Sequence, residues 1–359
     1  MASIVLAGGG TAGHIEPALA VARMWHTEHP EDHIIFLGTK SGLETTLVPA
    51  SGFELALIPK VAISRKPAFS WLNIPKDLIA SVRASFSIVN SADLLFGFGG
   101  YVSAPAYLAA RFAGIPIVVH EANAKPGWAN RLGALLTSYL AVANSVDNGK
   151  YSEALLTGLP LRSDVSTAFV DSRKDWAGAR AKAKARLGFP EGAPLLFIMG
   201  GSQGSVAINS VVADSLAALN AKKIAILHSV GRLNTMPIAG DMYRPVAYVQ
   251  EMALAYLASD VIIARSGAVT CSEFRALGRY ALFVPLPVGN GEQFHNARTL
   301  VDSGRAEIVS QSDFTADYLV ASIDQLLKRA SQAPIDGDAS DLDAAQKIVA
   351  LGERALGGS

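Results

Sequence analysis

The sequence predicts an α/β protein with two similar domains, each a parallel β-sheet covered by helices on both faces. Three observations lead to this prediction. Short apolar runs alternate with longer stretches of helical spacing. The alternation starts again after about Pro160. Each half opens with a strand-like run that leads directly into a glycine-rich turn. The length of 359 residues also suits two domains, because single domains usually span roughly 100–200 residues.

The first half carries the elements of the first predicted sheet. Its expected strands are rich in β-branched residues and bounded by glycine, proline or polar residues: Ile4–Ala7, His33–Leu37, Leu94–Gly97, Ile115–His120 and Leu140–Ala143. Helical spacing covers Pro17–Glu28 and Ala104–Phe112. This alternation is typical of βαβ units in a parallel sheet that is buried on both faces.

The second half repeats the pattern. Its expected strands are Leu195–Met199, Lys223–Leu227, Val246–Tyr248, Val261–Ala264 and Tyr280–Val284. We place the boundary near Leu159–Arg162, which gives a first domain of residues 1–161 and a second of residues 162–337. The stretch Gln332–Asp343 reads as a connector to a last helix, Ala344–Ala355. We expect this helix, within residues 344–359, to pack on the first domain and complete it.

Composition excludes several classes of protein. Lys and Arg total 31 and Asp and Glu total 31, and this zero net charge argues against a general nucleic-acid binder. Cys271 is the single cysteine, so no intramolecular disulfide can form, which fits a reducing cytoplasm. We see neither a signal-peptide pattern nor an apolar run of about 18 residues, so we expect no membrane span.

Both glycine-rich turns are candidates for phosphate binding. They are GGGTAGH at Gly8–His14 and GGSQGS at Gly200–Ser205. Glycine permits a positive φ and close backbone approach, and a helix start offers free N–H groups with a partial positive charge. Glycines that merely allow tight strand-to-helix packing are the alternative. Two such turns at matching positions favour phosphate binding.

The first turn also matches a dinucleotide fingerprint, because Gly8, Gly10 and Gly13 fit G-x-G-x-x-G. That fingerprint requires an acidic residue at the end of the next strand. The strand ends in Leu37-Gly38-Thr39, so a nicotinamide-dependent oxidoreductase is disfavoured. His14 follows the turn at the expected helix start, where an imidazole can accept a proton from a hydroxyl or bond a phosphate. Capping or packing is the alternative role.

Seven motifs occur in a fixed order along the chain: GGGTAGHIEPALAVA (Gly8–Ala22), GFGGYVSAPAYLAA (Gly97–Ala110), HEANAKPGWANR (His120–Arg131), GLPLR (Gly158–Arg162), GGSQGSVAIN (Gly200–Asn209), RSGAVTCSE (Arg265–Glu273) and PLPVGNGEQFHNA (Pro285–Ala297). Together they resemble the MurG family, the N-acetylglucosaminyltransferases of bacterial peptidoglycan synthesis. The resemblance covers about residues 4–310.

The resemblance implies a GT-B fold, in which two Rossmann-like domains face each other across a cleft. It implies transfer of GlcNAc from UDP-GlcNAc to the C4 hydroxyl of MurNAc in lipid I, giving lipid II and UDP. The anomeric centre is inverted, and neither a metal nor a cofactor is required. Asp336-Gly337-Asp338 has D-x-D spacing, but it lies in the connector and is expected to be solvated.

The resemblance assigns the donor to the second half. Val249 meets the uracil with Met252 nearby, Glu273 accepts from the ribose hydroxyls, and Arg162 assists nucleotide binding. The diphosphate falls to Ser202, Gln203 and Gly204. The sugar falls to the backbone of Ala268 and Val269, with Thr270 beside them, and to the side chains of Gln293 and Asn296.

The resemblance assigns the acceptor to the first half. Thr11, Ala12 and Gly13 are expected at the lipid diphosphate, and Asn123 lines the same region. His14 is our candidate general base, with a diphosphate contact as its other role. Glu121 is the competing base, and the alternative is that it only orients its neighbours.

A lipid acceptor raises the question of membrane binding. The stretch Ile63–Phe86 mixes apolar and cationic residues, and we predict a membrane patch of Phe69, Trp71, Leu72, Ile74, Lys76 and Arg83. An ordinary loop and a core-packed helix are the alternative. The resemblance favours the patch, on the inner face of the cytoplasmic membrane.

The chain departs from the family pattern at three positions, Ala12, Ala122 and Glu292, and these put some acceptor and sugar contacts in doubt. Another GT-B enzyme remains the alternative, either a glycolipid glycosyltransferase or a UDP-GlcNAc 2-epimerase. A noncatalytic binding module is disfavoured.

Overall fold

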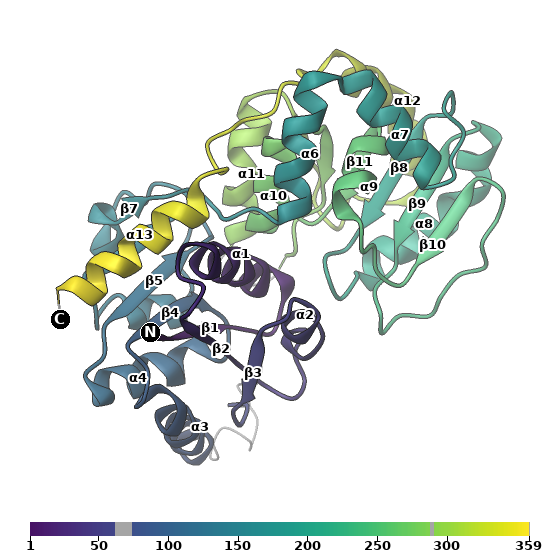
Figure 1. Cartoon of the computed structure of the whole chain (residues 1–359). Coiled ribbons are helices and arrows are strands. Elements are labelled where there is room, and N and C mark those ends of the chain that lie inside the picture. Colours follow the sequence, from purple (N-terminus) through teal and green to yellow (C-terminus); the bar gives the residue numbers. More distant parts are fainter. Residues whose placement is uncertain (62–73, 288–290, 359) are drawn as a thin grey trace. The chain divides into compact units, whose positions relative to one another are not determined.

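The computed structural model describes residues 1–61, 74–287 and 291–358. The chain divides into two compact units (Figure 1). Unit 1 comprises Met1–Leu161 together with Asp341–Ser359, and unit 2 comprises Arg162–Ser340. The chain therefore leaves unit 1, builds unit 2, and returns to unit 1 for its last helix.

Unit 1 contains a seven-stranded sheet in the order β3-β2-β1-β4-β5-β6-β7, with every pair parallel. The strands are β1 (Ser3–Gly8), β2 (His33–Gly38), β3 (Glu54–Leu57), β4 (Leu94–Gly99), β5 (Ile117–Glu121), β6 (Tyr139–Val142) and β7 (Leu155–Leu156). The helices are α1 (Ala12–Glu28), α2 (Glu44–Ala50), α3 (Ile74–Val89), α4 (Ser103–Ala113), α5 (Trp128–Gly133), the 3₁₀ turn η2 (Gly149–Glu153) and α13 (Ala344–Gly357).

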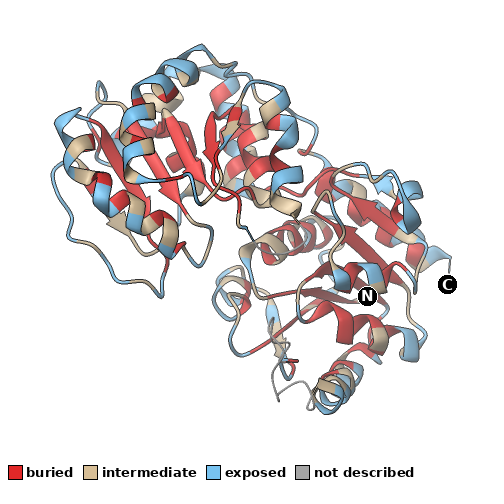
Figure 2. Cartoon of the chain, turned by 180° about the vertical axis from the view of Figure 1, so that it is seen from behind, coloured by how far each residue is buried: buried red, intermediate tan, exposed pale blue. Residues whose placement is uncertain are grey.

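Alternate residues of the unit 1 strands enter two different cores. Leu6 and Phe96 pack with Trp25 of α1 and Ile348 of α13. Val5 packs on the other face, in the core that includes Tyr107 of α4. Successive strand residues point to opposite faces, so apolar residues throughout β1 and β4 require helices on both sides. Figure 2 shows the buried strands between partly exposed helices.

Unit 2 repeats the architecture with six parallel strands in the order β10-β9-β8-β11-β12-β13. They are β8 (Leu195–Met199), β9 (Ala225–Ser229), β10 (Tyr243–Val246), β11 (Val261–Ala264), β12 (Ala281–Phe283) and β13 (Ala306–Ile308). The helices are α6 (Ser163–Lys174), α7 (Trp176–Arg186), α8 (Val206–Ala221), α9 (Met252–Ala258), α10 (Ala268–Ala276), α11 (Glu292–Asp302) and α12 (Ala316–Gln332).

The unit 2 sheet is likewise covered on both faces. Helices α8 and α12 supply Ile208, Leu319 and Ile323 to one core. On the other face, the Tyr256 and Phe274 rings meet edge to face with centroids 5.1 Å apart. The predicted fold class is thereby confirmed: two Rossmann-like units, each with a parallel sheet between helices.

The strand order fixes where a ligand can bind. In each sheet the chain first adds strands on one side of the starting strand and then crosses to the other side. The crossing places β4 beside β1 and β11 beside β8. Open α/β sheets bind ligands outside the carboxyl ends of the strands at this switch point. Both glycine-rich turns follow β1 and β8, so both lie at switch points.

Several element boundaries differ from the sequence prediction. The expected strand Val246–Tyr248 is wrong, because β10 is Tyr243–Val246 and pairs Tyr243 with Ile226 of β9. Strand β9 begins at Ala225 rather than Lys223 because Lys223, with a φ of 57°, adopts a left-handed conformation after α8. The short strands β3, β7 and β13 were not predicted. All three are edge strands of two to four residues, too short to show a clear period.

The described part of the chain contains no helix that is both long enough and apolar enough to cross a membrane.

Candidate functional site

The first glycine turn joins β1 to α1. Gly10 has a φ of 92°, and a Cβ on Gly8 would lie 2.7 Å from the His14 carbonyl oxygen, so both positions require glycine. Thr11 is the exposed N-cap residue of α1, and its hydroxyl lies 3.3 Å from Nδ1 of His14. Ala12 and Gly13 form the half-buried first turn of the helix. The predicted diphosphate residues Thr11, Ala12 and Gly13 thus surround a helix start.

His14 packs its ring against a second pair of glycines, Gly99 at the end of β4 and Gly100 after it. A Cβ on Gly99 would lie 3.2 Å from Cδ2 of His14, and one on Gly100 would lie 3.2 Å from Nδ1. Both glycines have φ near 90°, at 90° and 85°. Burial lowers the pKa of His14, and a hydrogen bond with the Gly9 backbone and the charge of Glu44 partly offset this effect. The ring is therefore mainly neutral near pH 7, the form that can accept a proton.

Glu121 ends β5 and is only 2% exposed. Its Oε1 accepts from the backbone and side-chain nitrogens of Asn123, at 2.9 and 3.0 Å. Its Oε2 accepts from Gly127 N at 2.9 Å and from Asn130 Nδ2 at 3.1 Å. Burial raises the pKa of Glu121, and these hydrogen bonds partly offset the effect. Glu121 accordingly holds the segment that follows it in place. In that segment Ala122 is buried and Asn123 is half-buried.

Asn130 is a residue that the sequence interpretation missed. Its Nδ2 also donates to the His120 carbonyl at 3.0 Å, and Tyr107 donates to its Oδ1 at 2.7 Å. The amide lies 3.4 Å from the position of a Cβ on Gly99, which is the glycine that also contacts His14. Asn130 therefore links the Glu121 loop to the surroundings of His14. It belongs to the motif HEANAKPGWANR, which was the available signal.

Glu44 was also missed. It begins α2, is 1% exposed, and accepts from three groups. Oε2 accepts from Gly10 N at 2.9 Å, whereas Oε1 accepts from Thr39 N at 2.8 Å and Thr39 Oγ1 at 3.0 Å. One carboxylate thus ties the first glycine turn to the turn after β2.

The second glycine turn joins β8 to α8. Gly204 has a φ of 75°, and a Cβ there would lie 2.0 Å from the Val230 carbonyl oxygen. Ser205 caps α8 by accepting from Ile208 N. Asn234 Nδ2 donates to the carbonyls of Gln203 at 3.1 Å and Val230 at 2.8 Å. These two hydrogen bonds hold the glycine turn against the segment that follows β9. The predicted diphosphate residues Ser202, Gln203 and Gly204 are half-buried, exposed and half-buried respectively.

Arg265, from the motif RSGAVTCSE, supports this second turn and was not assigned from sequence. It is 8% exposed, and its Nη2 donates to Ser205 Oγ at 2.8 Å. Its Nη1 donates to the carbonyls of Val284 and Pro285, at 2.8 and 3.0 Å. A guanidinium keeps its charge in such surroundings, so Arg265 adds positive charge at the start of α8.

Glu273 lies on α10 and is 3% exposed. Tyr256 of α9, itself buried, donates its hydroxyl to Glu273 Oε2 at 2.6 Å. Burial first, and then the charge of Glu273, raises the pKa of Tyr256 well above its usual value. Tyr256 therefore stays protonated and orients the Glu273 carboxylate.

Arg162 contacts the segment that precedes α9. Its Nε pairs with Asp164 Oδ1 at 3.1 Å, and its Nη2 donates to the Gln250 carbonyl at 3.3 Å. The charge of Arg162 also acts on the hydroxyl of Tyr256. Val249 is buried and Met252, the first residue of α9, is half-buried. The structure thus groups Arg162 with the Val249–Met252 segment and the Tyr256–Glu273 pair.

The predicted sugar contacts lie on two adjoining helices. Ala268, Val269 and Thr270 form the half-buried first turn of α10, after Gly267, whose Cβ position is open. Asn296 of α11 donates to the Ser266 carbonyl at 3.3 Å, and Gln293 Oε1 accepts from Leu286 N at 2.9 Å. Glu292 is half-buried at the start of α11. These side chains surround the carboxyl end of β11, on the same edge as the glycine turn.

Half of the predicted membrane patch can be placed. Ile74, Lys76 and Arg83 lie on α3, whereas Phe69, Trp71 and Leu72 lie outside the described residues.

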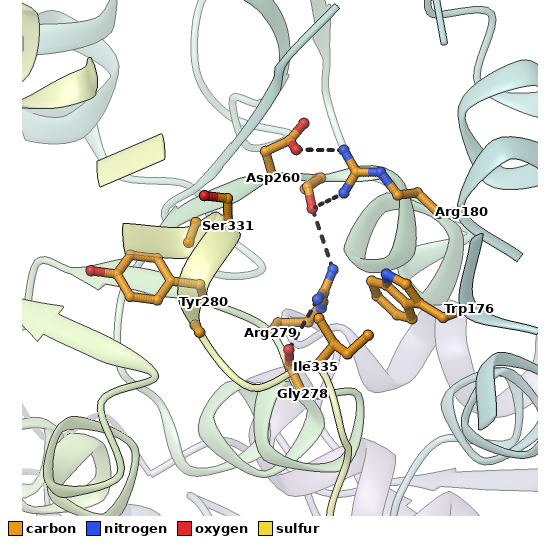
Figure 3. A pocket seen from close by; sticks show the side chains of 11 residues that line it. Trp176, Arg180, Asp260, Gly278, Arg279, Tyr280, Ser331 and Ile335 are labelled. Atoms are coloured by element: carbon orange, nitrogen blue, oxygen red, sulfur yellow. Dashed lines mark hydrogen bonds and ion pairs between the residues drawn. The ribbon is translucent and has the colours of Figure 1, made fainter. Parts of the chain in front are cut away.

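Unit 2 also has a pocket of about 240 Å³ at the opposite edge of its sheet (Figure 3). Asp260 precedes β11 and Arg279 precedes β12 in sequence, so the pocket lies at the amino ends of the strands. Arg279 lies over the Trp176 ring and donates to the carbonyls of Leu277, Gly278 and Ser259. Its donors therefore cap the carboxyl ends of α9 and α10. The residues that line the pocket stabilise these helix ends, and none of them belongs to the predicted site.

Comparison with known proteins decides the family. Residues 4–138 match the glycosyltransferase family 28 N-terminal domain, and residues 195–351 match its C-terminal domain. The chain is 43% identical over 327 residues to the Streptomyces coelicolor "UDP-N-acetylglucosamine--N-acetylmuramyl-(pentapeptide) pyrophosphoryl-undecaprenol N-acetylglucosamine transferase", covering 89% of this chain and 88% of the relative. The chain belongs to this transferase family. A Rhodococcus jostii member with the same name is 43% identical over 345 residues, covering 92% of this chain and 89% of the relative.

Solved structures agree with this membership. MurG from Acinetobacter baumannii superposes with a TM-score of 0.68 at 25% identity, covering 99% of this chain and 100% of that chain. A UDP-GlcNAc 2-epimerase from Neisseria meningitidis, bound to UDP-GlcNAc, reaches a TM-score of 0.58 at 13% identity, covering 99% and 100%. At that identity the epimerase shares the fold alone. The predicted resemblance to the MurG family is confirmed, and the protein is a glycosyltransferase.

Proposed function

We propose that this transferase moves GlcNAc from UDP-GlcNAc to the C4 hydroxyl of MurNAc in lipid I, producing lipid II and UDP with inversion of the anomeric centre. Unit 2 binds the donor and unit 1 binds the acceptor. No metal or cofactor takes part. The family relatives carry the name of this reaction, and the arrangement of Glu273 and Tyr256 is the structural observation that carries the proposal.

The donor site is built around the Glu273 carboxylate. A carboxylate that a buried tyrosine orients from one side can accept from the two ribose hydroxyls of the donor. The Val249–Met252 segment, which Arg162 contacts, receives the uracil. The second glycine turn and the start of α8 receive the diphosphate, because helix N-termini and glycine turns offer backbone N–H groups to anions. Ala268, Val269, Gln293 and Asn296 receive the sugar.

The acceptor reaction requires one proton to leave the attacking hydroxyl. In this proposal the neutral His14 accepts that proton while the C4 oxygen forms a bond to the anomeric carbon. The bond from the anomeric carbon to the β-phosphate oxygen breaks, and UDP leaves with the bonding pair. Glu121 does not act as the base, since its two oxygens already accept four hydrogen bonds. It positions Asn123 instead.

Helix α3 supports peripheral attachment to the inner face of the cytoplasmic membrane. Its buried positions include Ser81 and Ser85, whereas Ile79 and Phe86 are 52% and 37% exposed. The cations Lys76 and Arg83 are exposed on the same helix. A helix that buries serines and exposes apolar side chains beside cations suits a surface of anionic lipid headgroups. A lipid-linked acceptor would be reached from such a surface.

The test is transfer of radiolabelled GlcNAc from UDP-GlcNAc to a short-chain lipid I analogue in the presence of EDTA. We expect a labelled disaccharide lipid and stoichiometric UDP. A chain that binds UDP-GlcNAc but yields no such product would contradict the proposal. Conversion of the donor alone to UDP-ManNAc would instead identify a 2-epimerase.

A further inference from the structure

We propose that Glu44 is a positioning residue of the acceptor site: its buried carboxylate holds the first glycine turn in the conformation that presents His14. This inference rests on the proposed function, since it concerns the residue that receives the acceptor proton. Glu44 lies outside the seven motifs and touches no reacting atom in this scheme.

The carboxylate connects two turns that are far apart in sequence. Gly10 N donates to Oε2, and both the N–H and the hydroxyl of Thr39 donate to Oε1. Glu44 thereby fixes Gly10 relative to the end of β2. Gly10 lies four residues before His14, in the loop that leads into α1. The carbonyl of Thr11, the next residue after Gly10, accepts from His14 N at 3.1 Å. A displacement of Gly10 would therefore be passed to the imidazole.

Three glycines make room for this side chain. A Cβ on Gly42 would lie 1.8 Å from Glu44 Oε2, one on Gly38 would lie 2.5 Å from its Cγ, and one on Gly9 would lie 3.2 Å from its Oε1. Gly38 and Gly42 both have φ outside the left-handed range, so other residues could adopt their backbone conformation. The Glu44 side chain therefore excludes a Cβ at Gly42, and together with Leu55 it excludes one at Gly38.

Glu44 also contributes charge to the surroundings of His14. Its negative charge raises the pKa of His14 against the larger, lowering effect of burial. The ring also lies near the Thr11 hydroxyl and the backbone of Gly9, Gly99 and Gly100.

The other titratable groups on the surrounding elements include Glu16, which is buried on α1 two residues after His14. Tyr101 lies against Gly10 and has Lys60 5.1 Å from its ring centroid. Glu121 lies beyond the Asn130 amide. Glu44 is a charged side chain with a resolved effect on the pKa of His14, so its removal should alter the protonation of the ring.

Glu44 follows the strand at whose end a dinucleotide-binding fold has its acidic residue. In a dinucleotide-binding fold the acidic residue near the end of the second strand accepts from a ribose. Here an acidic residue follows that strand by several positions, but it points inward and accepts from Thr39 and Gly10. The same region of the sheet has a carboxylate that holds protein backbone instead of a ribose.

Two variants separate the effect of the Glu44 side-chain length from the effect of its charge. E44Q keeps the length of the side chain, removes the charge, and places an amide N–H against a backbone donor. E44D keeps the charge but is one methylene too short to reach both turns. The matched control is E54Q, since Glu54 is an exposed acid of the same unit that pairs with His33 at 3.0 Å.

Two measurements are made on the full-length protein: steady-state transfer to the lipid I analogue, and an NMR titration of the His14 imidazole. We expect kcat to fall in both variants, roughly tenfold to a hundredfold, because small misplacements of a catalytic group cost about this much. The KM for UDP-GlcNAc should stay within about twofold. The pKa of His14 should fall in E44Q, remain closer to wild type in E44D, and not change in E54Q.

A kcat within about threefold of wild type in both variants would overturn the proposal. So would an unchanged His14 titration in E44Q. The titration needs no substrate, so it tests the effect of Glu44 on His14 even if the wild-type enzyme proves to use another acceptor. In that case the proposed function would fail while the effect of Glu44 on His14 remained supported.

Discussion

The two glycine turns occupy equivalent places in the two units, but the structure supports them with opposite charges. In unit 1 the carboxylate of Glu44 accepts from Gly10 N just before α1. In unit 2 the guanidinium of Arg265 donates to Ser205 Oγ at the start of α8. A helix start attracts anions through its partial positive charge. The Glu44 carboxylate is itself an anion near the start of α1, so it reduces the attraction of that helix start for an anionic ligand. The Arg265 guanidinium increases the corresponding attraction at α8.

This difference suggests a division of labour between similar turns. The second turn is suited to a strongly anionic group such as the diphosphate of a nucleotide sugar. The first turn lies beside a neutral histidine, so in addition to the predicted lipid diphosphate it suits a hydroxyl that must lose a proton. Matching sequence motifs at matching switch points therefore do not imply matching ligands. The residues beneath each turn differ, and they determine its electrostatics.

The largest effect is expected at His14. His14→Ala should lower kcat by roughly 10² to 10⁴, because general base catalysis contributes about this much. Donor affinity should not change, since His14 belongs to unit 1. Single-turnover transfer and calorimetric titration with UDP-GlcNAc measure the two quantities separately. Wild-type turnover in this variant would show that His14 is not the base, and would contradict the different roles assigned to the two glycine turns.

The next effect is expected at Glu273. Glu273→Ala should weaken UDP-GlcNAc binding by roughly 10²- to 10⁴-fold, since hydrogen bonds to a charged group are each worth about 1.5–3 kcal/mol and two are lost. Tyr256→Phe is the milder companion, because it removes only the hydroxyl that orients the carboxylate. Calorimetric titration with UDP-GlcNAc gives both affinities. Unchanged donor affinity in Glu273→Ala would refute the ribose role.

Each unit contains a histidine that is only 1% exposed and that should make the unit sensitive to acid. Burial lowers the pKa of His120 in unit 1 and of His228 in unit 2 to about 4. His120 Nε2 bonds the Gly158 carbonyl at 3.0 Å, and His228 lies between Tyr243 and Asn209. Their pKa values in the unfolded chain are higher, near 6.5, so acid favours unfolding.

The stabilisation from each neutral histidine is complete above about pH 6.5 and is lost as the pH falls toward 4. At pH 5 the loss should be roughly 2 kcal/mol per histidine. Urea unfolding at pH 7.5 and pH 5 measures it. His120→Gln and His228→Gln should each flatten the pH dependence, and an unaltered slope in either variant would contradict the assignment for that unit.

The smallest effect is expected on membrane binding. The double variant Ile79→Ser with Phe86→Ser should reduce co-sedimentation with anionic vesicles several-fold, because each exposed side chain buries only part of its surface at an interface. Val170→Ser is the control, since Val170 is 48% exposed on α6 of unit 2. Equal loss in the control would show that the effect is not specific to α3.

Much of the fold could be predicted because it depends on local pattern. Buried strands such as Val261–Ala264 appear as continuous apolar runs, and the glycine turns mark where each strand meets its helix. The edge strands could not be predicted in this way. Strand β7 has two exposed residues, and β10 contains Pro245, so neither shows the apolar run that marks a central strand.

The candidate site could be predicted only where its residues fall in motifs. The glycines, His14, Glu121 and Glu273 stand in such motifs, and their burial and contacts are now described. Glu44 lies outside the motifs, and Asn130 and Arg265 stand in motifs but were not assigned, because the roles of all three arise from tertiary contacts. Glu44 and Gly10 are 34 positions apart, and Arg265 and Ser205 are 60 apart. No local spacing reports such a pair.

Amide hydrogen exchange with and without UDP tests the division of labour most directly. Our account predicts that UDP slows exchange in the Gly200–Ser205 turn and at Val249–Met252, and leaves the Gly8–His14 turn unchanged. Protection of Gly8–His14 with none at Gly200–Ser205 would contradict it, because the nucleotide would then bind at the turn that Glu44 supports.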